Sequence, residues 1–185
     1  MMLMLPTSLP GGKPSGFTWG VPYLLGRIYL TDLLGMYELA AGIFLGGLVY
    51  MPLCLLEVRL SPQLHTWVYG FHQHFFGQSL RFGGYRPTVF MEHGLMVGLW
   101  LSMSPLTGFW LWYSGTMRSL FRIPMPWLLV PLTATTVLCK SFGAIVLLIV
   151  GLGVLITTRQ SSSRSIIAAL AIAPLLYMAL RIPGI

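Results

Sequence analysis

Charged side chains are scarce in this sequence, and their scarcity limits the kind of protein that it can form. Only 8% of the 185 residues are charged, whereas 56% are apolar. Soluble domains carry about 25% charged residues, so this chain has too few to cover a surface exposed to water. We therefore expect an all-α integral membrane protein, because helices satisfy their own backbone hydrogen bonds inside a bilayer.

Acidic residues are the rarest charged type. The sequence has four of them against 11 Lys and Arg, which gives a net charge of +7. The basic residues occur singly rather than in one patch, which is typical of loops at lipid headgroups and not of a nucleic-acid-binding surface. We expect membrane lipid, and no nucleic acid, among the partners. The acids are Asp32, Glu38, Glu57 and Glu92.

Cysteine is also scarce, and no residue set has the spacing of a metal site. Cys54 and Cys139 lie far apart in apolar runs, without a second ligand beside either, and we interpret both as buried thiols without a chemical role. The histidines His65, His72 and His74 have no carboxylate at ligand spacing, and the last two would point to opposite sides of a helix. The sequence therefore predicts no metal site.

Long apolar runs recur along the chain. A bilayer core of about 30 Å requires about 20 apolar residues in a helix. The run 124–158 is too long for one crossing, and a charged residue inside a span costs roughly 2.5 to 3.5 kcal/mol, so we expect a tight hairpin with Lys140 at the headgroups. The sequence thus predicts about five transmembrane helices, at 33–56, 93–114, 124–139, 142–158 and 165–180.

The remaining segments complete the expected domain organisation. Residues 1–32 are rich in proline and glycine, and we expect an N-terminal leader loop before a polytopic membrane domain at 33–181. The basic residues divide almost equally between the two faces, so the positive-inside rule alone does not orient the chain. If Arg81 and Arg86 bind a ligand, the other basic residues favour a cytoplasmic N-terminus and an outward-facing 57–92 loop.

The first half of the 57–92 loop predicts an interfacial helix. Ser61 is a suitable N-cap, and Pro62 suits the first helical position. Apolar residues then recur at helical spacing from Leu64 to Phe75, which is typical of an amphipathic helix lying in the membrane interface. The three histidines fall around its polar side.

The second half of this loop collects arginine and glycine in the sequence RFGGYR. Arg81 and Arg86 flank the Gly83-Gly84 pair. Guanidinium groups bind phosphate oxygens through paired hydrogen bonds, and glycine lets the backbone adopt positive φ and approach a ligand closely. These residues predict an anion site.

Two further residues would support that site. Pro87 suits the start of the next span, so Glu92 and His93 would lie in its first turns, near a ligand held by the arginines. An alternative stays open: the arginines would anchor the loop to lipid phosphates, and Glu92 would pair with Arg86. In that case His93 would only support a contact between helices.

The sequence RFGGYRPTVFMEHGLMVGLW, followed farther along by TTVLCKSFGAIVLLIVGLGVLI, resembles the O-antigen ligase and polymerase superfamily of bacterial envelope glycosyltransferases. The resemblance covers residues 48–155, and Lys140 replaces the arginine of a later motif. It implies a multi-pass protein of the bacterial inner membrane, without metal or nucleotide cofactor. It also implies that Arg81, Arg86 and Lys140 hold the diphosphate of a polyprenyl-linked glycan at the periplasmic face.

The chain departs from the superfamily in one respect that concerns catalysis. Chains of the superfamily have further spans and a large periplasmic loop with the catalytic histidine, and nothing here matches that loop. His93 belongs to a different motif, so the sequence assigns no catalytic residue. Three alternatives stay open: the chain is a fragment, a companion polypeptide completes a metal-independent glycan ligase, or the chain has no transferase activity of its own.

A small transporter or channel subunit is the alternative function, and a membrane scaffold is a third. In a transporter or channel, Glu38 would lie buried one turn into the first span and serve as a carboxylate in an ion pathway. Transporters commonly contain internal repeats, and the two halves of this chain show none. The sequence therefore favours the ligase-like function.

Overall fold

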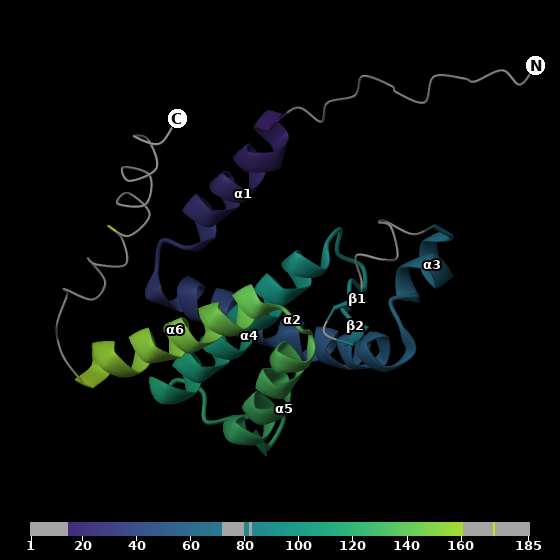
Figure 1. Cartoon of the computed structure of the whole chain (residues 1–185). Helices are drawn as coiled ribbons and strands as arrows, with labels where there is room; N and C mark the ends of the chain where they lie inside the picture. The colour runs from purple at the N-terminus through teal and green to yellow at the C-terminus, as the bar shows by residue number, and fades with distance from the viewer. Residues whose placement is uncertain (1–14, 72–79, 82, 161–171, 173–185) are drawn as a thin grey trace, which may run out of the picture. The chain divides into compact units, whose positions relative to one another are not determined.

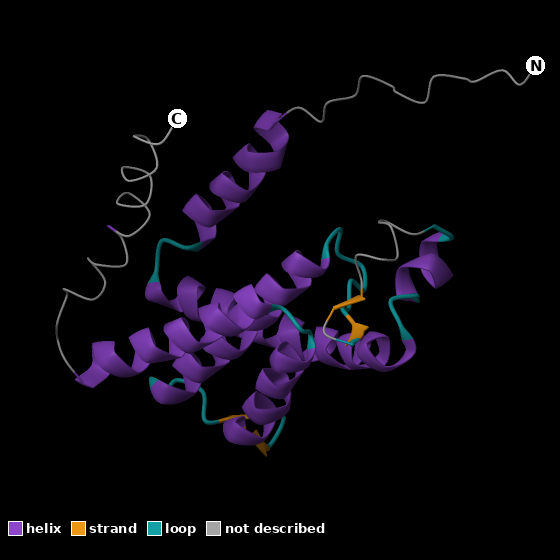
Figure 2. Ribbon diagram, viewed as in Figure 1, coloured by secondary structure: helices purple, strands orange, loops and turns teal. Residues whose placement is uncertain are grey.

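The computed structural model describes residues 15–71, 80–81, 83–160 and 172. The chain divides into two compact units, Met1–Leu39 and Ala40–Ile185, and each is described by itself. Helices make up most of the described structure (Figures 1 and 2). The expectation of a helical fold is therefore confirmed.

The first unit contains α1 (Ser15–Tyr29) and the beginning of α2 (Leu33–Leu60). The assignment of residues 1–32 to a leader loop is wrong for the residues of α1. Most of the prolines that suggested a loop precede this helix, whereas good helix formers such as Leu24 and Leu25 lie within it.

Glu38 lies in the part of α2 that belongs to the first unit, and its side chain is exposed. The expected burial of Glu38 is therefore wrong. Among residues 33–39, Gly35 and Tyr37 are half-buried and the others are exposed.

The second unit contains the rest of α2 and three further long helices. Glycines at the helix contacts let α2 pack closely against two of these helices. Phe44 is fully buried over Gly108, and a Cβ atom added at Gly47 would collide with Ser104 and lie 3.6 Å from the Leu132 Cδ1. These contacts form the centre of the core. The three helices are α4 (Gly94–Tyr113), α5 (Met125–Leu138) and α6 (Phe142–Gln160).

Helix α4 packs against both α5 and α6 (Figure 1). A Cβ atom added at Gly98 would lie 2.7 Å from the Ser141 Oγ, and one added at Gly151 would lie 2.6 Å from the Leu106 Cδ1. Residues near the start of α4 contact the start of α6, and residues farther along α4 contact residues farther along α6. The two helices therefore run parallel. Both therefore begin at the same end of the unit.

Two helices, α2 and α4, are long and apolar enough to cross a membrane by length and composition. The helices Met125–Leu138 and Phe142–Thr158 are apolar but shorter. The first four predicted spans thus coincide with helices, and length and composition support a crossing for two of them. The fifth predicted span, 165–180, lies outside the described residues apart from position 172.

Two short hairpins connect these helices. Strand β1 (Leu80–Arg81) pairs antiparallel with β2 (Gly84–Tyr85), before α4. Strand β3 (Ser119–Leu120) pairs antiparallel with β4 (Ile123–Pro124), between α4 and α5.

The predicted interfacial helix is present only as the short helix α3 (Leu64–Tyr69). The predicted start is wrong: the N-cap is Gln63, which makes no side-chain cap hydrogen bond, and Ser61 has a φ of 95°. The helix ends at Gly70, whose φ of 77° is left-handed and breaks the helical hydrogen-bond pattern. The predicted continuation through 72–75 lies outside the described residues.

His65 is buried rather than on a polar face, which corrects its predicted position. Its Nδ1–H donates a hydrogen bond to the Phe71 carbonyl oxygen at 3.0 Å, and its ring packs against Tyr69 and Phe71. A buried imidazole needs such a partner, so His65 stabilises the end of α3. His72 and His74 lie outside the described residues.

Candidate functional site

Two of the predicted diphosphate-binding residues lie at the same place in the fold. Arg86 is only 8% exposed, and its Nη2 donates a hydrogen bond to the Ser141 Oγ at 3.3 Å. The neighbouring Lys140 lies against β2, because a Cβ atom added at Gly84 would collide with the Lys140 Nζ. We call Arg86, Lys140 and Ser141 the Arg86 cluster.

Two helices begin at the Arg86 cluster. Helix α6 starts directly after Ser141, and the Arg86 side chain crosses the first turn of α4, where a Cβ atom at Gly94 would lie 2.9 Å from the Arg86 Nε. The first N–H groups of a helix lack intrahelical partners and carry partial positive charge. The two helix starts therefore add to the charges of Arg86 and Lys140, and together they favour an anion.

Lys140 reaches this position through the turn between α5 and α6. Its φ is 52°, and its backbone N–H donates to the Val137 carbonyl oxygen at 3.2 Å. A left-handed residue after the last turn of a helix reverses the chain direction. The chain thus turns at Lys140, as the sequence analysis predicts.

Glu57, at the end of α2, has a role that the sequence did not indicate. Its carboxylate is 1% exposed, and one oxygen accepts hydrogen bonds from the backbone N–H groups of Thr88 and Val89, both at 2.8 Å. The other oxygen accepts a hydrogen bond from the Leu64 N–H at 3.1 Å. The sequence does show a lone acid at the end of an apolar helix. If such a carboxylate is buried, it must accept hydrogen bonds from nearby donors, and this requirement could have indicated its role.

A second residue of α2 holds the same loop. The Tyr50 hydroxyl accepts a hydrogen bond from the Phe90 backbone N–H at 3.1 Å. Tyr50 and Glu57 lie about two turns apart, on the same face of the helix. Three consecutive backbone N–H groups that follow the Arg86-Pro87 pair are therefore held by α2.

Helix α4 does not begin at Pro87. It begins at Gly94, with His93 as its N-cap residue. Val89, two residues after Pro87, has a φ of 48°, which a right-handed helix does not allow. The predicted helix start at Pro87 is therefore too early.

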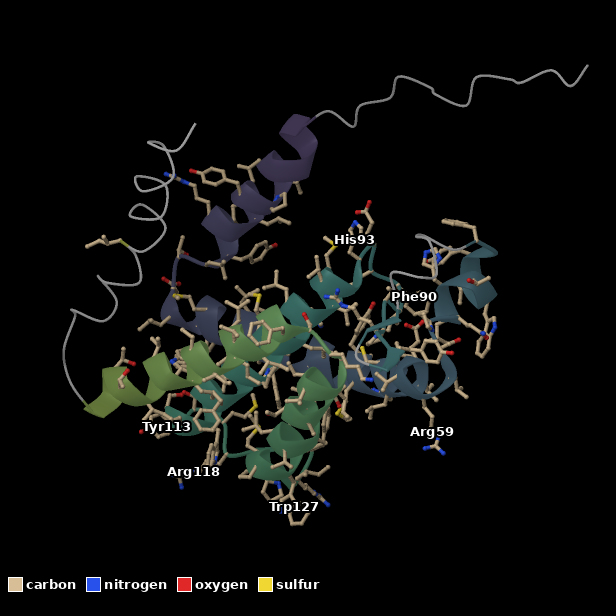
Figure 3. All side chains as sticks on the ribbon, in the orientation of Figure 1. Arg59, Phe90, His93, Tyr113, Arg118 and Trp127 are labelled. Carbon is tan, nitrogen blue, oxygen red and sulfur yellow. The ribbon has the colours of Figure 1, made fainter. Side chains whose placement is uncertain are left out.

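The predicted supporting residues occupy different surroundings. Gly83 has a φ of 69°, so it uses the conformational freedom of glycine at the tip of the β1–β2 hairpin. Glu92 and His93 are exposed and precede α4, rather than lying in its first turns (Figure 3). Arg81 pairs with Gly84 in the hairpin, and its side chain lies outside the described part of the chain.

The described residues contain no group of three or more His, Cys, Asp or Glu side chains that could hold a metal ion. The chemistry of the Arg86 cluster is that of binding an anion by charge and hydrogen bonding. Arginine is suited to phosphate because its planar fork offers paired donors.

No protein-family model, no curated protein and no solved structure matches this chain.

Proposed function

We propose that this chain is a multi-pass protein of the bacterial inner membrane that binds the diphosphate of a polyprenyl-linked glycan at the Arg86 cluster. This is the role that the resemblance to O-antigen ligases implies. The observation that supports it is the meeting of Arg86 and Lys140 with the starts of α4 and α6. Four sources of positive potential at one place suit an anion of multiple charge.

The burial of Arg86 supports ligand binding rather than anchoring to lipid. An arginine that anchors a loop extends its head into water or headgroups. Arg59 and Arg118 are exposed and extend away from the helices in this way (Figure 3). Arg86 instead lies 8% exposed against Gly94 and Ser141, beside the starts of α4 and α6.

A groove between α4 and α6 supports a ligand with a hydrocarbon chain. The groove has a volume of about 520 Å³, and nearly all of its surface is apolar. It begins at Leu99 and Leu147, close to the contact of Gly98 with Ser141, and extends to Leu155. A lipid whose phosphates bind at the Arg86 cluster would therefore find an apolar groove beginning beside it.

The proposed activity is binding, and we assign no catalytic residue. A companion polypeptide would complete a metal-independent glycan transfer. The alternative of a transporter or channel subunit has less support, because Glu38 is exposed rather than enclosed by helices.

The test measures binding of pyrophosphate and of undecaprenyl diphosphate to the purified full chain in nanodiscs. Arg86→Lys should weaken both ligands about tenfold or more, since a hydrogen bond to a charged group contributes about 1.5 to 3 kcal/mol and lysine lacks the fork. Arg81→Lys should behave similarly if Arg81 shares the diphosphate. Lys140→Ala should also weaken binding, because it removes a charge.

Arg59→Lys is the matched control, because Arg59 is exposed at the end of α2 and away from the cluster. Its affinity should equal that of the unaltered protein. Unchanged affinity in Arg86→Lys and Lys140→Ala, with thermal unfolding intact, would refute the anion site. Pyrophosphate binding without tighter binding of the lipid would restrict the proposal to the diphosphate.

A further inference from the structure

Cys54 and Cys139 lie together in the core, although they are far apart in the sequence. They are 0% and 1% exposed, and their side chains lie close enough to interact. The prediction that both thiols are buried is confirmed. Their contact was not expected, and it gives the chain an adjacent pair of thiols.

The packing of α2 on α5 explains this contact. Phe44 and Leu129 both contact the position of Gly108, and Gly47 lies near Leu132 one turn later on each helix. The two helices therefore run in the same direction along their contact. Two turns farther along α2, the face that carries Gly47 carries Cys54. Two turns farther along α5, the face that carries Leu132 reaches Cys139 at the end of the helix.

Cys139 keeps the helical geometry that this alignment requires. It is the C-cap residue of α5, with φ of −67° and ψ of −1°. Its side chain therefore continues the face of α5 that carries Leu132. The thiol contact is thus a consequence of helix packing and not of a flexible loop.

We propose that Cys54 and Cys139 form a disulfide when a low-molecular-weight disulfide oxidant is present. One cysteine, as the thiolate, attacks a sulfur of glutathione disulfide and releases one glutathione thiol. The second cysteine then displaces the remaining glutathione from the mixed disulfide. Two protons and two electrons pass from the cysteines, and one glutathione disulfide becomes two glutathione thiols.

The disulfide would join the two parts of the fold that build the Arg86 cluster. Cys139 directly precedes Lys140 and Ser141, and Cys54 lies one turn before Glu57, which holds the loop that follows Arg86. The bond would therefore fasten both sides of the cluster covalently. Its formation does not depend on the binding of an anion.

Burial determines when the bond can form. Thiols enclosed in an apolar core react slowly, so oxidation occurs while the helices assemble or when they open. On the membrane placement proposed above, the pair lies at the periplasmic end of α2, and the periplasm is a compartment in which disulfides form.

The test separates access of the oxidant from compatibility with the fold. The full chain is oxidised with glutathione disulfide in SDS, where both thiols are accessible, and is then refolded into nanodiscs beside the dithiol form. The disulfide form should refold and unfold at a higher temperature than the dithiol form. The thiol–disulfide equilibrium with glutathione should favour the disulfide at least about tenfold more in nanodiscs than in SDS, or about 30 mV.

Two results would overturn the proposal: a disulfide form that does not refold while the dithiol form does, or an equilibrium no more favourable in nanodiscs than in SDS. Cys54→Ser and Cys139→Ser are the controls, because neither can form the intramolecular bond, and a non-reducing gel separates any dimer. Arg59→Lys, at an exposed position, should show the unaltered thiol equilibrium, and the anion site is tested separately by pyrophosphate binding. Failure of the anion site and failure of the disulfide are therefore distinguishable.

Discussion

The Glu57 carboxylate, at the end of α2, accepts a hydrogen bond from the backbone N–H of Val89 at 2.8 Å. Val89 is fully buried and has a φ of 48°, which a β-branched residue rarely adopts. The left-handed conformation costs about 1 to 2 kcal/mol, and the hydrogen bonds to the carboxylate offset this cost. A single buried acid thus holds the turn that follows Arg86 and precedes α4.

Glu57→Gln should destabilise the folded protein. The amide keeps one acceptor oxygen but turns an NH₂ group toward at least one of the three N–H donors, which leaves a buried donor without an acceptor. The cost is about 1 to 3 kcal/mol. We expect a lower midpoint of thermal unfolding in detergent. Glu92→Gln, at an exposed acid, should leave the midpoint unchanged, and equal midpoints for the two variants would contradict the role of Glu57.

Gly108→Ala should also destabilise the protein, because the new methyl group would overlap Phe44 and lie 2.9 Å from the Leu129 Cδ2. Overpacking of a core costs about 1 to 3 kcal/mol. Gly153→Ala, in α6, is the matched control, since a Cβ atom there meets nothing within 4 Å. That variant should gain about 0.5 to 1 kcal/mol from helix propensity. Unfolding midpoints that shift in the same direction for both variants would contradict the packing of α2 on α4.

The β3–β4 hairpin should become more stable with Asn-Gly at its tip. Phe121 and Arg122 have φ values of 50° and 66°, and Phe121 is 80% exposed, so its replacement removes little packing. Asn and Gly favour such turns, and the double variant Phe121→Asn, Arg122→Gly should gain about 1 to 2 kcal/mol. Arg118→Gly is the control, because Arg118 is exposed and lies outside the pair of positive-φ residues at 121 and 122. It should give no gain in stability. A loss of stability in the double variant would show that the tip is held by other contacts.

Cysteine labelling should place the two ends of α4 on opposite sides of the membrane. In a background with Cys54→Ser and Cys139→Ser, Glu92→Cys should react with an impermeant maleimide on spheroplasts. Thr116→Cys should react only after lysis. Both target residues are exposed and flank α4. Labelling of both before lysis would contradict the crossing by α4, and the reverse pattern would contradict the proposed orientation.

Several elements could be predicted from the sequence because they depend on local properties. The lengths of the apolar runs indicate α2, α4, α5 and α6, since a helix satisfies its own backbone hydrogen bonds wherever it lies. The break at Lys140 follows from the cost of a charge within an apolar helix. Helix α1 was not predicted because residues 1–32 as a whole are rich in proline and glycine. Most of these prolines, however, lie before the helix.

The arrangement of the site depends on contacts between distant residues, and only the tertiary structure determines it. Nothing near Pro87 indicates that Glu57 will hold the next two N–H groups, or that α4 will begin only at Gly94. The contact of Cys54 with Cys139 likewise requires α2 and α5 to run in the same direction at a fixed register. Apolar composition determines that helices pack, but the shapes of their small and large residues determine which faces meet. For that reason the sequence alone indicated the residues of an anion site, and the packing of α2, α4 and α6 decided which of them lie together.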